Sequence, residues 1–344
     1  MTSSGKTSTV LITGASGFIG LHTTLHALQQ GYSVRATVRS QSQAAAVTRA
    51  LSPLVDTSRL GFAFTDLLKD EGWEEAVKGC DHVIHTAAPY VADNPRDESI
   101  LIAPTRDGSL RMLAAAIDEG IHRVVFLSTI GAIFDGHEGE RRVFTEADWS
   151  DVTKPRLIYH KAKTLAEQAA WDMVNSHRNT SGMEMVAINP SNVMGPVLDG
   201  HFHTSIEWYR TLMHAEVSGV SHSQLDLVDV RDLVGILFKA MTLPEAAGKR
   251  FICNGASIPI VEFAGILHRS FSSRGYRIPH TIIPDFSIRL FGLFSPKIKA
   301  IAATLGWEYS FATDQVISVF GWQPRPYQNT IVEMAESLIA FGLV

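Results

Sequence analysis

Short apolar runs alternate with segments of helical spacing along the first ~130 residues of the chain. Strands buried on both faces of a parallel sheet form nearly continuous apolar runs, whereas helices repeat their apolar residues roughly every three or four positions. Gly31 follows the first helical segment and is typical of a helix end. The alternation predicts a parallel, doubly wound sheet with right-handed crossovers. We expect strands at 9–13, 32–38, 60–64, 81–85 and 123–127, and further helices at 41–51, 73–78 and about 98–119.

Beyond Gly131 the alternation becomes less regular. The last ~85 residues show helical spacing without the strand rhythm of a parallel sheet. We therefore expect an α/β fold with two domains. The first domain is expected at 1–195, and the strands and helix of 225–256 are expected to join it. The second domain, smaller and mostly helical, is expected at 196–224 and 257–344. The elements expected in this half are helices at about 157–177 and 230–241, and strands at 185–189, 225–228 and 250–253.

A glycine-rich turn, Thr13-Gly14-Ala15-Ser16-Gly17-Phe18-Ile19-Gly20, joins the first strand to the first helix. Gly14 permits the tight turn, Gly17 lets the backbone approach a pyrophosphate, and Gly20 lets the helix pack against the strand. The helix N-terminus adds amide donors and the positive end of its dipole. The first domain is therefore expected to be a Rossmann-type dinucleotide-binding domain, and the second to bind substrate. The residues expected to bind the dinucleotide here are Gly14, Ser16, Gly17, Phe18, Ile19 and Gly20.

The end of the second strand indicates which nucleotide is bound. An NAD site usually places an acid there for the ribose hydroxyls, whereas this chain has Val38-Arg39-Ser40 with no acid nearby. Arg39 is expected to bind a 2′-phosphate bidentately, which predicts NADP (NADPH) as the cofactor; a solvated surface arginine is the alternative. Asp66 and Leu67, just after the third strand, are expected at the adenine edge, with a helix-capping Asp66 as the alternative.

Tyr159 and Lys163 stand four residues apart, on one face of the helix expected at 157–177. A free tyrosine has a pKa of about 10 and is a poor acid–base group at neutral pH. A lysine ammonium beside it favours the phenolate and lowers that pKa. Such a tyrosine can protonate a carbonyl oxygen while hydride reaches the carbon, and the lysine can hold the nicotinamide ribose. The pair predicts hydride transfer to a carbonyl, with a chance occurrence of this spacing as the alternative.

Composition excludes several classes of protein. The 344 residues are 45% hydrophobic and 19% charged, with a formal net charge of −5. Without a basic stripe or an uncharged apolar run of ~18 residues, we expect neither nucleic acid nor a membrane as partner. The polar N-terminal segment has no apolar signal core, so we expect a cytoplasmic protein, either monomer or homodimer. Cys80 and Cys253 match no metal spacing, and His201 and His203 lack a further ligand, so we expect no metal.

Together these residues resemble the extended short-chain dehydrogenases/reductases, and more narrowly their dihydroflavonol-reductase-like branch of carbonyl, aldehyde and ketone reductases. The glycine turn and the Tyr159–Lys163 pair are typical of the superfamily, and the motifs further along are typical of the branch. The resemblance covers nearly the whole chain. Besides the glycine turn, it is carried by GCDHVIHTAAP at 79–89, NPSNVMGP at 189–196, DVRDL at 229–233, FGWQPRP at 320–326 and ESLI at 336–339.

The resemblance implies an NADPH-dependent reductase that transfers hydride to a small-molecule aldehyde or ketone, a bulky or aromatic one, with Tyr159 as the general acid. This chain departs from the branch at Gln43, where relatives often carry a second basic residue, and at Arg111, where many carry Asn. The cofactor contacts that the resemblance implies are Thr86, Ala87 and Ala88 under the diphosphate and ribose, and Pro190, Ser191 and Val193 beside the nicotinamide.

The third catalytic hydroxyl of the family is usually a serine. Thr129 matches that position here, with Ser128 directly before it, and both are candidates. Ile130 belongs to the apolar run that follows, and Tyr90 leaves the fourth strand at the ligand-bearing carboxyl edge. We expect Tyr90 and Ile130 to line the substrate pocket.

Other functions share parts of this sequence: a sugar-nucleotide epimerase or dehydratase, a steroid-type dehydrogenase, and a non-enzymatic NADP-sensing protein. Dehydratases of that group need an acid pair after the catalytic Thr, where this chain has Ile130-Gly131-Ala132. An apolar wall suits an apolar carbonyl substrate better. Sensors usually lose the Tyr or the Lys, and both are present here. A carbonyl reductase is therefore the principal hypothesis.

Overall fold

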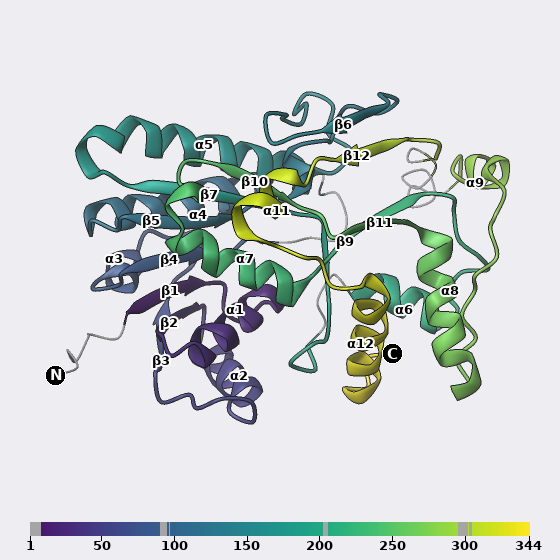
Figure 1. Cartoon of the computed structure of the whole chain (residues 1–344), viewed down its shortest axis with the longest axis horizontal. Coiled ribbons are helices and arrows are strands. Elements are labelled where there is room, and N and C mark those ends of the chain that lie inside the picture. The colour runs from purple at the N-terminus through teal and green to yellow at the C-terminus, as the bar shows by residue number, and fades with distance from the viewer. Residues whose placement is uncertain (1–7, 90–94, 96, 202–205, 295–301, 303–304) are drawn as a thin grey trace.

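The computed structural model describes residues 8–89, 95, 97–201, 206–294, 302 and 305–344. Its centre is a seven-stranded sheet in which every neighbouring pair of strands is parallel (Figure 1). This arrangement confirms the expected doubly wound α/β fold. In spatial order the strands are β3 (Leu60–Phe64), β2 (Ser33–Val38), β1 (Thr9–Thr13), β4 (His82–His85), β5 (Arg123–Leu127), β7 (Glu184–Pro190) and β10 (Arg250–Cys253).

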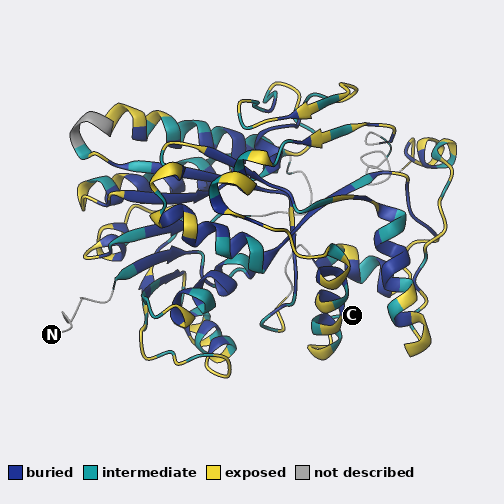
Figure 2. Cartoon of the chain, viewed as in Figure 1, coloured by how far each residue is buried: buried dark blue, intermediate teal, exposed yellow. Residues whose placement is uncertain are grey.

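Helices cover both faces of this sheet (Figure 1). Neighbouring residues of a strand point to opposite faces. In β1, Val10 and Ile12 pack on one side of the sheet, and Leu11 packs on the other. Figure 2 shows the buried centre and the exposed outer surfaces of the helices. The first face carries α1 (Phe18–Gln29), α2 (Gln41–Leu51) and α7 (Val230–Thr242), and the second carries α3 (Trp73–Val77), α4 (Ser99–Asp118) and α5 (Ile158–Ser181).

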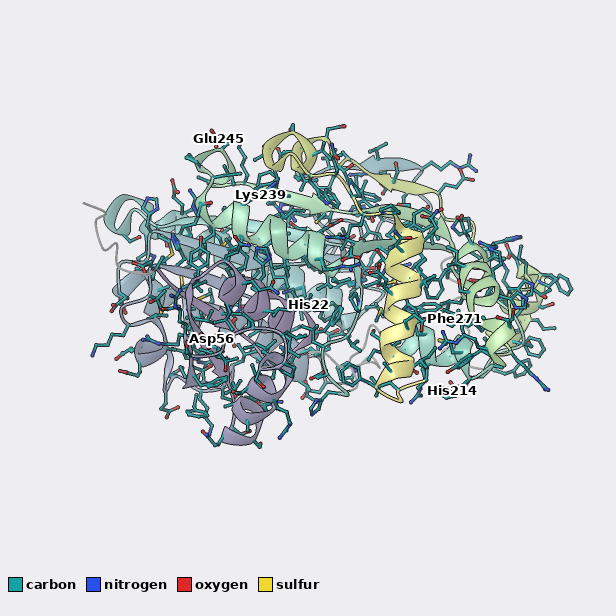
Figure 3. The ribbon with its side chains drawn as sticks, turned by 60° about the horizontal axis from the view of Figure 1, so that its bottom comes forward. His22, Asp56, His214, Lys239, Glu245 and Phe271 are labelled. Carbon is teal, nitrogen blue, oxygen red and sulfur yellow. The ribbon has the colours of Figure 1, made fainter. Side chains whose placement is uncertain are left out.

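A second group of elements lies at the end of the molecule opposite the N-terminus, next to the C-terminus (Figure 1). One apolar cluster includes Val10 of the main sheet together with Phe263 and Leu338 of this group, so the two parts share a core. His22 of α1, marked in Figure 3, joins them through a contact of 2.8 Å between its Nε2 and Pro196 O. The group contains β8 (Asn192–Met194), β9 (Gln224–Asp229), β11 (Ala256–Pro259), α6 (Glu207–Met213), α8 (Ile260–Phe271), α9 (Asp285–Phe291) and α12 (Tyr327–Ala340).

The strand expected at 225–228 forms as β9, but the expectation that it joins the main sheet is wrong. β9 pairs with β8 and β11 in a separate three-stranded sheet. β7 already has β5 on one side and β10 on the other, so neither of its edges is open to another strand. The strand expected at 250–253 does join the main sheet, as β10.

A third, two-stranded sheet pairs β12 (Tyr309–Phe311) with β6 (Arg142–Phe144). β12 is a strand in a part of the chain where the sequence shows only helical spacing. Apolar residues of this sheet pack against the segment that follows β5, in a cluster that includes Phe134, Phe144 and Phe311. The remaining named elements are η1 (Ile130–Ala132), η3 (Pro244–Ala246), η4 (Ser272–Arg274) and α11 (Asp314–Phe320).

A buried carboxylate on α5 ties this helix to three strands of the main sheet. Glu167 is fully buried and pairs with Arg250, whose Nε lies 2.6 Å from Glu167 Oε1. Ser128 Oγ donates to Glu167 Oε2 at 2.5 Å, and Asn189 Nδ2 donates to the same oxygen at 2.8 Å. These partners come from β10, the end of β5 and β7. The network therefore fixes where α5 lies against the sheet.

Glu167→Ala is expected to lower the free energy of unfolding by about 3–5 kcal/mol, because it leaves Arg250 as a buried charge without its partner. Glu308→Ala is the matched control, since Glu308 and its partner Arg141 are exposed by 63% and 76%. It should cost about 0–1 kcal/mol. Urea unfolding followed by circular dichroism measures both losses. Equal losses would contradict the role given to the network.

Candidate active site at the carboxyl edge of the sheet

The strand order places a switch point between β1 and β4. From β1 the chain continues through β2 and β3 to one edge, and from β4 it continues through β5, β7 and β10 to the other. Ligands of doubly wound sheets bind in the crevice beyond the carboxyl ends of the strands at such a point. Gly14 directly follows β1, and Thr86 directly follows β4. The glycine turn and the expected diphosphate contacts therefore lie at the switch point.

The glycines of the turn are required by close backbone approaches. Gly14 has φ +68°, and a Cβ added there would lie 2.8 Å from Ala87 Cα. A Cβ added to Gly20 would lie 2.2 Å from the Gly14 carbonyl oxygen. Gly17 precedes α1, and no side chain within the described residues caps that helix or places an acid in its first turn. The N-terminal end of α1 thus suits an anion, so the turn fits the diphosphate of a dinucleotide.

A chain of hydrogen bonds holds the ends of β1 and β4 together beneath this turn. Thr13 Oγ1 accepts from the amides of Thr86 and Ala87, both at 3.1 Å, so its own proton goes to His85 Nδ1 at 2.9 Å. His85 Nε2 then carries the ring proton and donates to Ser109 Oγ at 3.1 Å. Burial lowers the pKa of His85 to about 3, which keeps the ring neutral. By holding the Thr13 hydroxyl, the neutral ring indirectly fixes Thr86 and Ala87, which are expected to contact the cofactor.

Arg39 extends from the carboxyl end of β2, and its side chain is exposed. Its backbone amide donates to Gln43 Oε1 at 2.8 Å, and the Gln43 amide donates to Ser40 Oγ at 3.3 Å. Ser40 thus caps the start of α2, and the Gln43 side chain satisfies the backbone amide just before the cap. Across the described part of the chain, the Arg39 guanidinium has no ion pair or hydrogen bond. It is therefore available to a phosphate, and its binding of a 2′-phosphate stays a prediction.

Asp66 and Leu67 form the turn that follows β3. Asp66 Oδ1 accepts from the Leu68 amide at 3.0 Å, so the carboxylate holds its own turn. Leu67 O accepts from Arg111 Nη1 at 2.9 Å, and Arg111 also pairs with Asp70. Asp66 therefore holds a turn and does not cap α3, whose N-cap residue is Gly72, and Arg111 holds the same turn. Contact of Asp66 and Leu67 with adenine stays a prediction.

Tyr159 and Lys163 lie on the first two turns of α5. Lys163 is 4% exposed, and its Nζ donates to Leu127 O at 2.6 Å. Burial lowers the pKa of Lys163 to about 8, although the charge of Glu167 acts in the opposite direction. Leu127 is the last residue of β5. The bond therefore holds the Tyr159 face of α5 at the carboxyl edge of the sheet.

Ser128 and Thr129 differ in what their hydroxyls contact. The Ser128 hydroxyl is buried and donates its proton to Glu167. Thr129 Oγ1 accepts from the Gly131 amide at 3.1 Å, and no described residue accepts its proton. Since a hydroxyl has a single proton to donate, Ser128 has none left for a ligand. These contacts favour Thr129 over Ser128 as the third catalytic hydroxyl.

The remaining predicted cofactor contacts also lie at this edge. β7 ends at Pro190, and the Ser191 amide donates to Cys253 O, at the end of β10, at 3.1 Å. Val193 pairs with Val228 in the three-stranded sheet. The strands thus bring Pro190, Ser191 and Val193 to and past the end of the main sheet. Their contact with nicotinamide stays a prediction.

The two predicted pocket residues have different outcomes. Ile130 is 6% exposed and packs in the cluster of Phe134, Phe144 and Trp307. The segment after Thr129 is therefore apolar, but most of the Ile130 side chain is taken up by this packing. Tyr90 lies outside the described residues.

The sequence analysis did not identify the buried polar residues that hold the segments of the candidate site in place. Glu167 lies one helical turn after Lys163, and this spacing was its only signal in the sequence. Its partner Arg250 is 83 residues away in the chain and carries no motif. His85 stands in a motif that the sequence analysis identifies, but its contacts with Thr13 and Ser109 depend on the sheet order.

Among the described residues, no group of three His, Cys, Asp or Glu side chains is placed to hold a metal ion. His201 Nδ1 lies 3.0 Å from Asp199 Oδ2, whereas His203 lies outside the described residues. In the same part of the chain, no helix has the length and apolar character needed to cross a membrane.

Comparisons with known proteins add to this geometry. Residues 10–254 match the model of the NAD dependent epimerase/dehydratase family. The chain is 32% identical to dihydroflavonol 4-reductase of Zea mays over 285 residues, which cover 79% of this chain and 76% of that protein. It is 32% identical to cinnamoyl-CoA reductase 1 of Petunia hybrida over 334 residues, which cover 96% and 91%. Its structure resembles yeast methylglyoxal/isovaleraldehyde reductase Gre2, solved with NADPH, with a TM-score of 0.81, 25% identity and coverage of 98% and 100%.

Lys163→Met is expected to remove a pH-dependent contribution to stability. Burial lowers the pKa of Lys163 from 10.5 to about 8, so between these values the unfolded chain binds a proton that the folded chain does not. Wild-type stability should therefore rise with pH across this window relative to the variant, by about 3 kcal/mol in total. Urea unfolding of both proteins at several pH values measures the difference. A difference that stays constant with pH would contradict the shift.

Proposed function

Because the chain belongs to the NAD-dependent epimerase/dehydratase family of extended short-chain dehydrogenases/reductases, we propose that it is an NADPH-dependent carbonyl reductase. Family membership confirms the expectation from the sequence motifs. The observation that carries the proposal is the bond from Lys163 Nζ to Leu127 O. It holds the Tyr159 face of α5 at the carboxyl end of β5, directly before Ser128 and Thr129. This arrangement supports Tyr159 as the proton donor and Thr129 as the second hydroxyl, at the edge where the glycine turn fits a dinucleotide.

The substrate that we propose is a small-molecule aldehyde or ketone, a bulky or aromatic one. The proteins that the chain resembles are reductases, and the name of the yeast enzyme specifies methylglyoxal and isovaleraldehyde. Thr129 is followed by Ile130, Gly131 and Ala132, which offer no carboxyl group to a sugar-type leaving group. This segment supports a carbonyl substrate over dehydratase chemistry. Monomer or homodimer, and a cytoplasmic location, stay predictions.

Bound NADPH would supply the hydride. The turn from Gly14 to Gly20 and the start of α1 would bind its diphosphate, and Arg39 would bind its 2′-phosphate. Lys163 would hold the nicotinamide ribose. Tyr159 would give its hydroxyl proton to the carbonyl oxygen of the substrate, while the Thr129 hydroxyl donates a hydrogen bond to the same oxygen. The contacts proposed to border the cofactor further along are Thr86, Ala87, Ala88, Pro190, Ser191 and Val193.

Purified protein is expected to consume NADPH with members of a panel of aromatic and aliphatic aldehydes and ketones, measured as a fall in NADPH absorbance. Tyr159→Phe should fold and bind NADPH, because only the hydroxyl is removed. Its kcat should fall by ~10²–10⁴, the usual effect of losing general acid–base catalysis. If the wild-type protein consumes NADPH with none of the aldehydes and ketones, the proposed function is overturned. Near-normal turnover by Tyr159→Phe would overturn only the role of the tyrosine.

Thr129→Val and Ser128→Ala should have opposite signatures. Thr129→Val removes a donor to the substrate oxygen and should lower kcat by ~10²–10³ with unchanged NADPH affinity. Ser128→Ala takes a donor from buried Glu167, so it should cost about 1–3 kcal/mol of stability with a much smaller effect on kcat. Steady-state kinetics and urea unfolding of both variants separate the two roles. If Ser128→Ala abolishes turnover and Thr129→Val does not, Ser128 is the catalytic hydroxyl.

Arg39→Ala should weaken NADPH binding by about 1.5–3 kcal/mol, the range of a hydrogen bond to a charged group. NADH lacks the 2′-phosphate, so its affinity should barely change. Titration of cofactor fluorescence gives both dissociation constants. Gln43→Ala is the control, because it removes the bond to the Arg39 backbone amide but keeps the Arg39 guanidinium, so it should leave the ratio of the two constants unchanged. Equal weakening of NADPH and NADH by Arg39→Ala would place the selectivity elsewhere.

A further inference from the structure

The turn that follows Thr129 contacts α5 directly beside Tyr159. A Cβ added to Gly131 would lie 2.2 Å from Cδ2 and 2.7 Å from Nε2 of His160, so the imidazole packs against the Gly131 backbone. Gly131 stands two residues after Thr129, and His160 stands one residue after Tyr159. The two segments that carry the proposed catalytic hydroxyls therefore meet at a contact between a glycine and an imidazole.

A buried carboxylate holds the same imidazole from its other side. Asp135 is 1% exposed and accepts from the backbone amide and from Nε of Arg156, both at 3.0 Å. His160 Nδ1 lies 3.3 Å from Asp135 Oδ2, so the carboxylate contacts the imidazole although the pair lacks hydrogen-bond geometry. Burial raises the pKa of Asp135, but His160 and Arg156 outweigh it and leave the pKa below its ordinary value. The carboxylate thus carries its charge near the start of α5, where the helix dipole favours it.

Gly131 and Asp135 belong to one turn whose shape is fixed by Ser150. Ser150 Oγ donates to Gly131 O at 2.8 Å and accepts from the Asp135 amide at 2.9 Å. The Ser150 amide donates to Ala132 O at 3.1 Å. The imidazole of His160 is therefore held between the two ends of a turn that is itself cross-linked. A shift of the turn relative to α5 would break both contacts at once.

We propose that His160 and Asp135 are positioning residues, which set the Tyr159 hydroxyl at a fixed separation from the Thr129 hydroxyl. The inference rests on the proposed function, because it concerns the same two hydroxyls. Lys163 fixes the second turn of α5 against Leu127, and His160 fixes the first turn. The Glu167 network fixes the third turn against the sheet, whereas His160 joins the first turn to the segment that carries Thr129. Misplacing a reacting group by about 1 Å can cost ~10²-fold in rate.

A double-mutant cycle between Gly131 and His160 tests the contact. Gly131→Ala should lower both the melting temperature and kcat, because its methyl group meets the imidazole. His160→Ala removes the atoms that collide, so the double variant should recover part of both losses. Independent sites would instead give losses that add. Melting temperatures supply this result without any enzyme activity.

The positioning role is tested by separating turnover from cofactor binding. His160→Ala and Asp135→Asn should each lower kcat by about tenfold, while the dissociation constant of NADPH, measured by fluorescence, stays unchanged. His177→Ala is the matched control, since His177 is an exposed histidine further along α5. It should leave kcat unchanged. Asp135→Asn keeps the shape of the side chain, so it carries the test if His160→Ala does not fold.

Wild-type kcat in both His160→Ala and Asp135→Asn would overturn the inference, and so would a double variant whose losses simply add. A parallel loss of NADPH binding would also overturn it, because that result indicates a general structural role. An inactive wild-type protein would overturn the proposed function instead. The melting temperatures of the cycle would then still decide whether the contact exists.

Discussion

The need to bury two charges on one face of α5 determines the geometry around the candidate active site. Lys163 and Glu167 lie one helical turn apart, and neither can leave water without partners at a tolerable free-energy cost. Lys163 bonds to the last carbonyl of β5, and Glu167 bonds to Ser128, Asn189 and Arg250. Because these partners come from β5, β7 and β10, the helix satisfies both charges in a single position against the sheet. Tyr159, one turn before Lys163, is carried to the carboxyl edge by the same requirement.

The same constraint separates the roles of two adjacent hydroxyls. Glu167 accepts the hydrogen bond that Ser128 donates, and that bond holds Ser128 toward α5. Thr129 is the N-cap of η1: its side-chain oxygen accepts from the Gly131 amide, and its proton has no acceptor in the described part of the chain. A residue that supports the helix and a residue that is available to a ligand are therefore neighbours in the sequence. Residue type alone cannot distinguish them, because serine and threonine donate equally well.

Much of the fold follows from the sequence, and the departures have physical causes. Continuous apolar runs predict the strands of the main sheet, and the glycine turn predicts the switch point where a dinucleotide fits. The strand at 225–228 is also predictable, but its partners are not, because they are the short strands β8 and β11 outside the main sheet. Local spacing also places Tyr159 and Lys163 on one face of a helix. The partners of Glu167 and of His85 are set by strands distant in sequence, so no local pattern could indicate them.

Three buried polar groups lie behind the residues that we propose to contact cofactor and substrate: the His85 chain, the Glu167 network and the Asp135 cluster. Replacing such groups by well-packed apolar side chains is often neutral or stabilising, so their contribution to folding free energy does not explain their placement. Hydrogen bonds and ion pairs have preferred directions, whereas apolar contacts tolerate small sliding movements. Each of the three groups restricts one backbone segment, respectively the start of the Thr86 segment, the end of β5 and the start of α5. These segments carry the groups that the proposed hydride transfer needs in accurate positions. Directional polar contacts hold such positions better than apolar packing does.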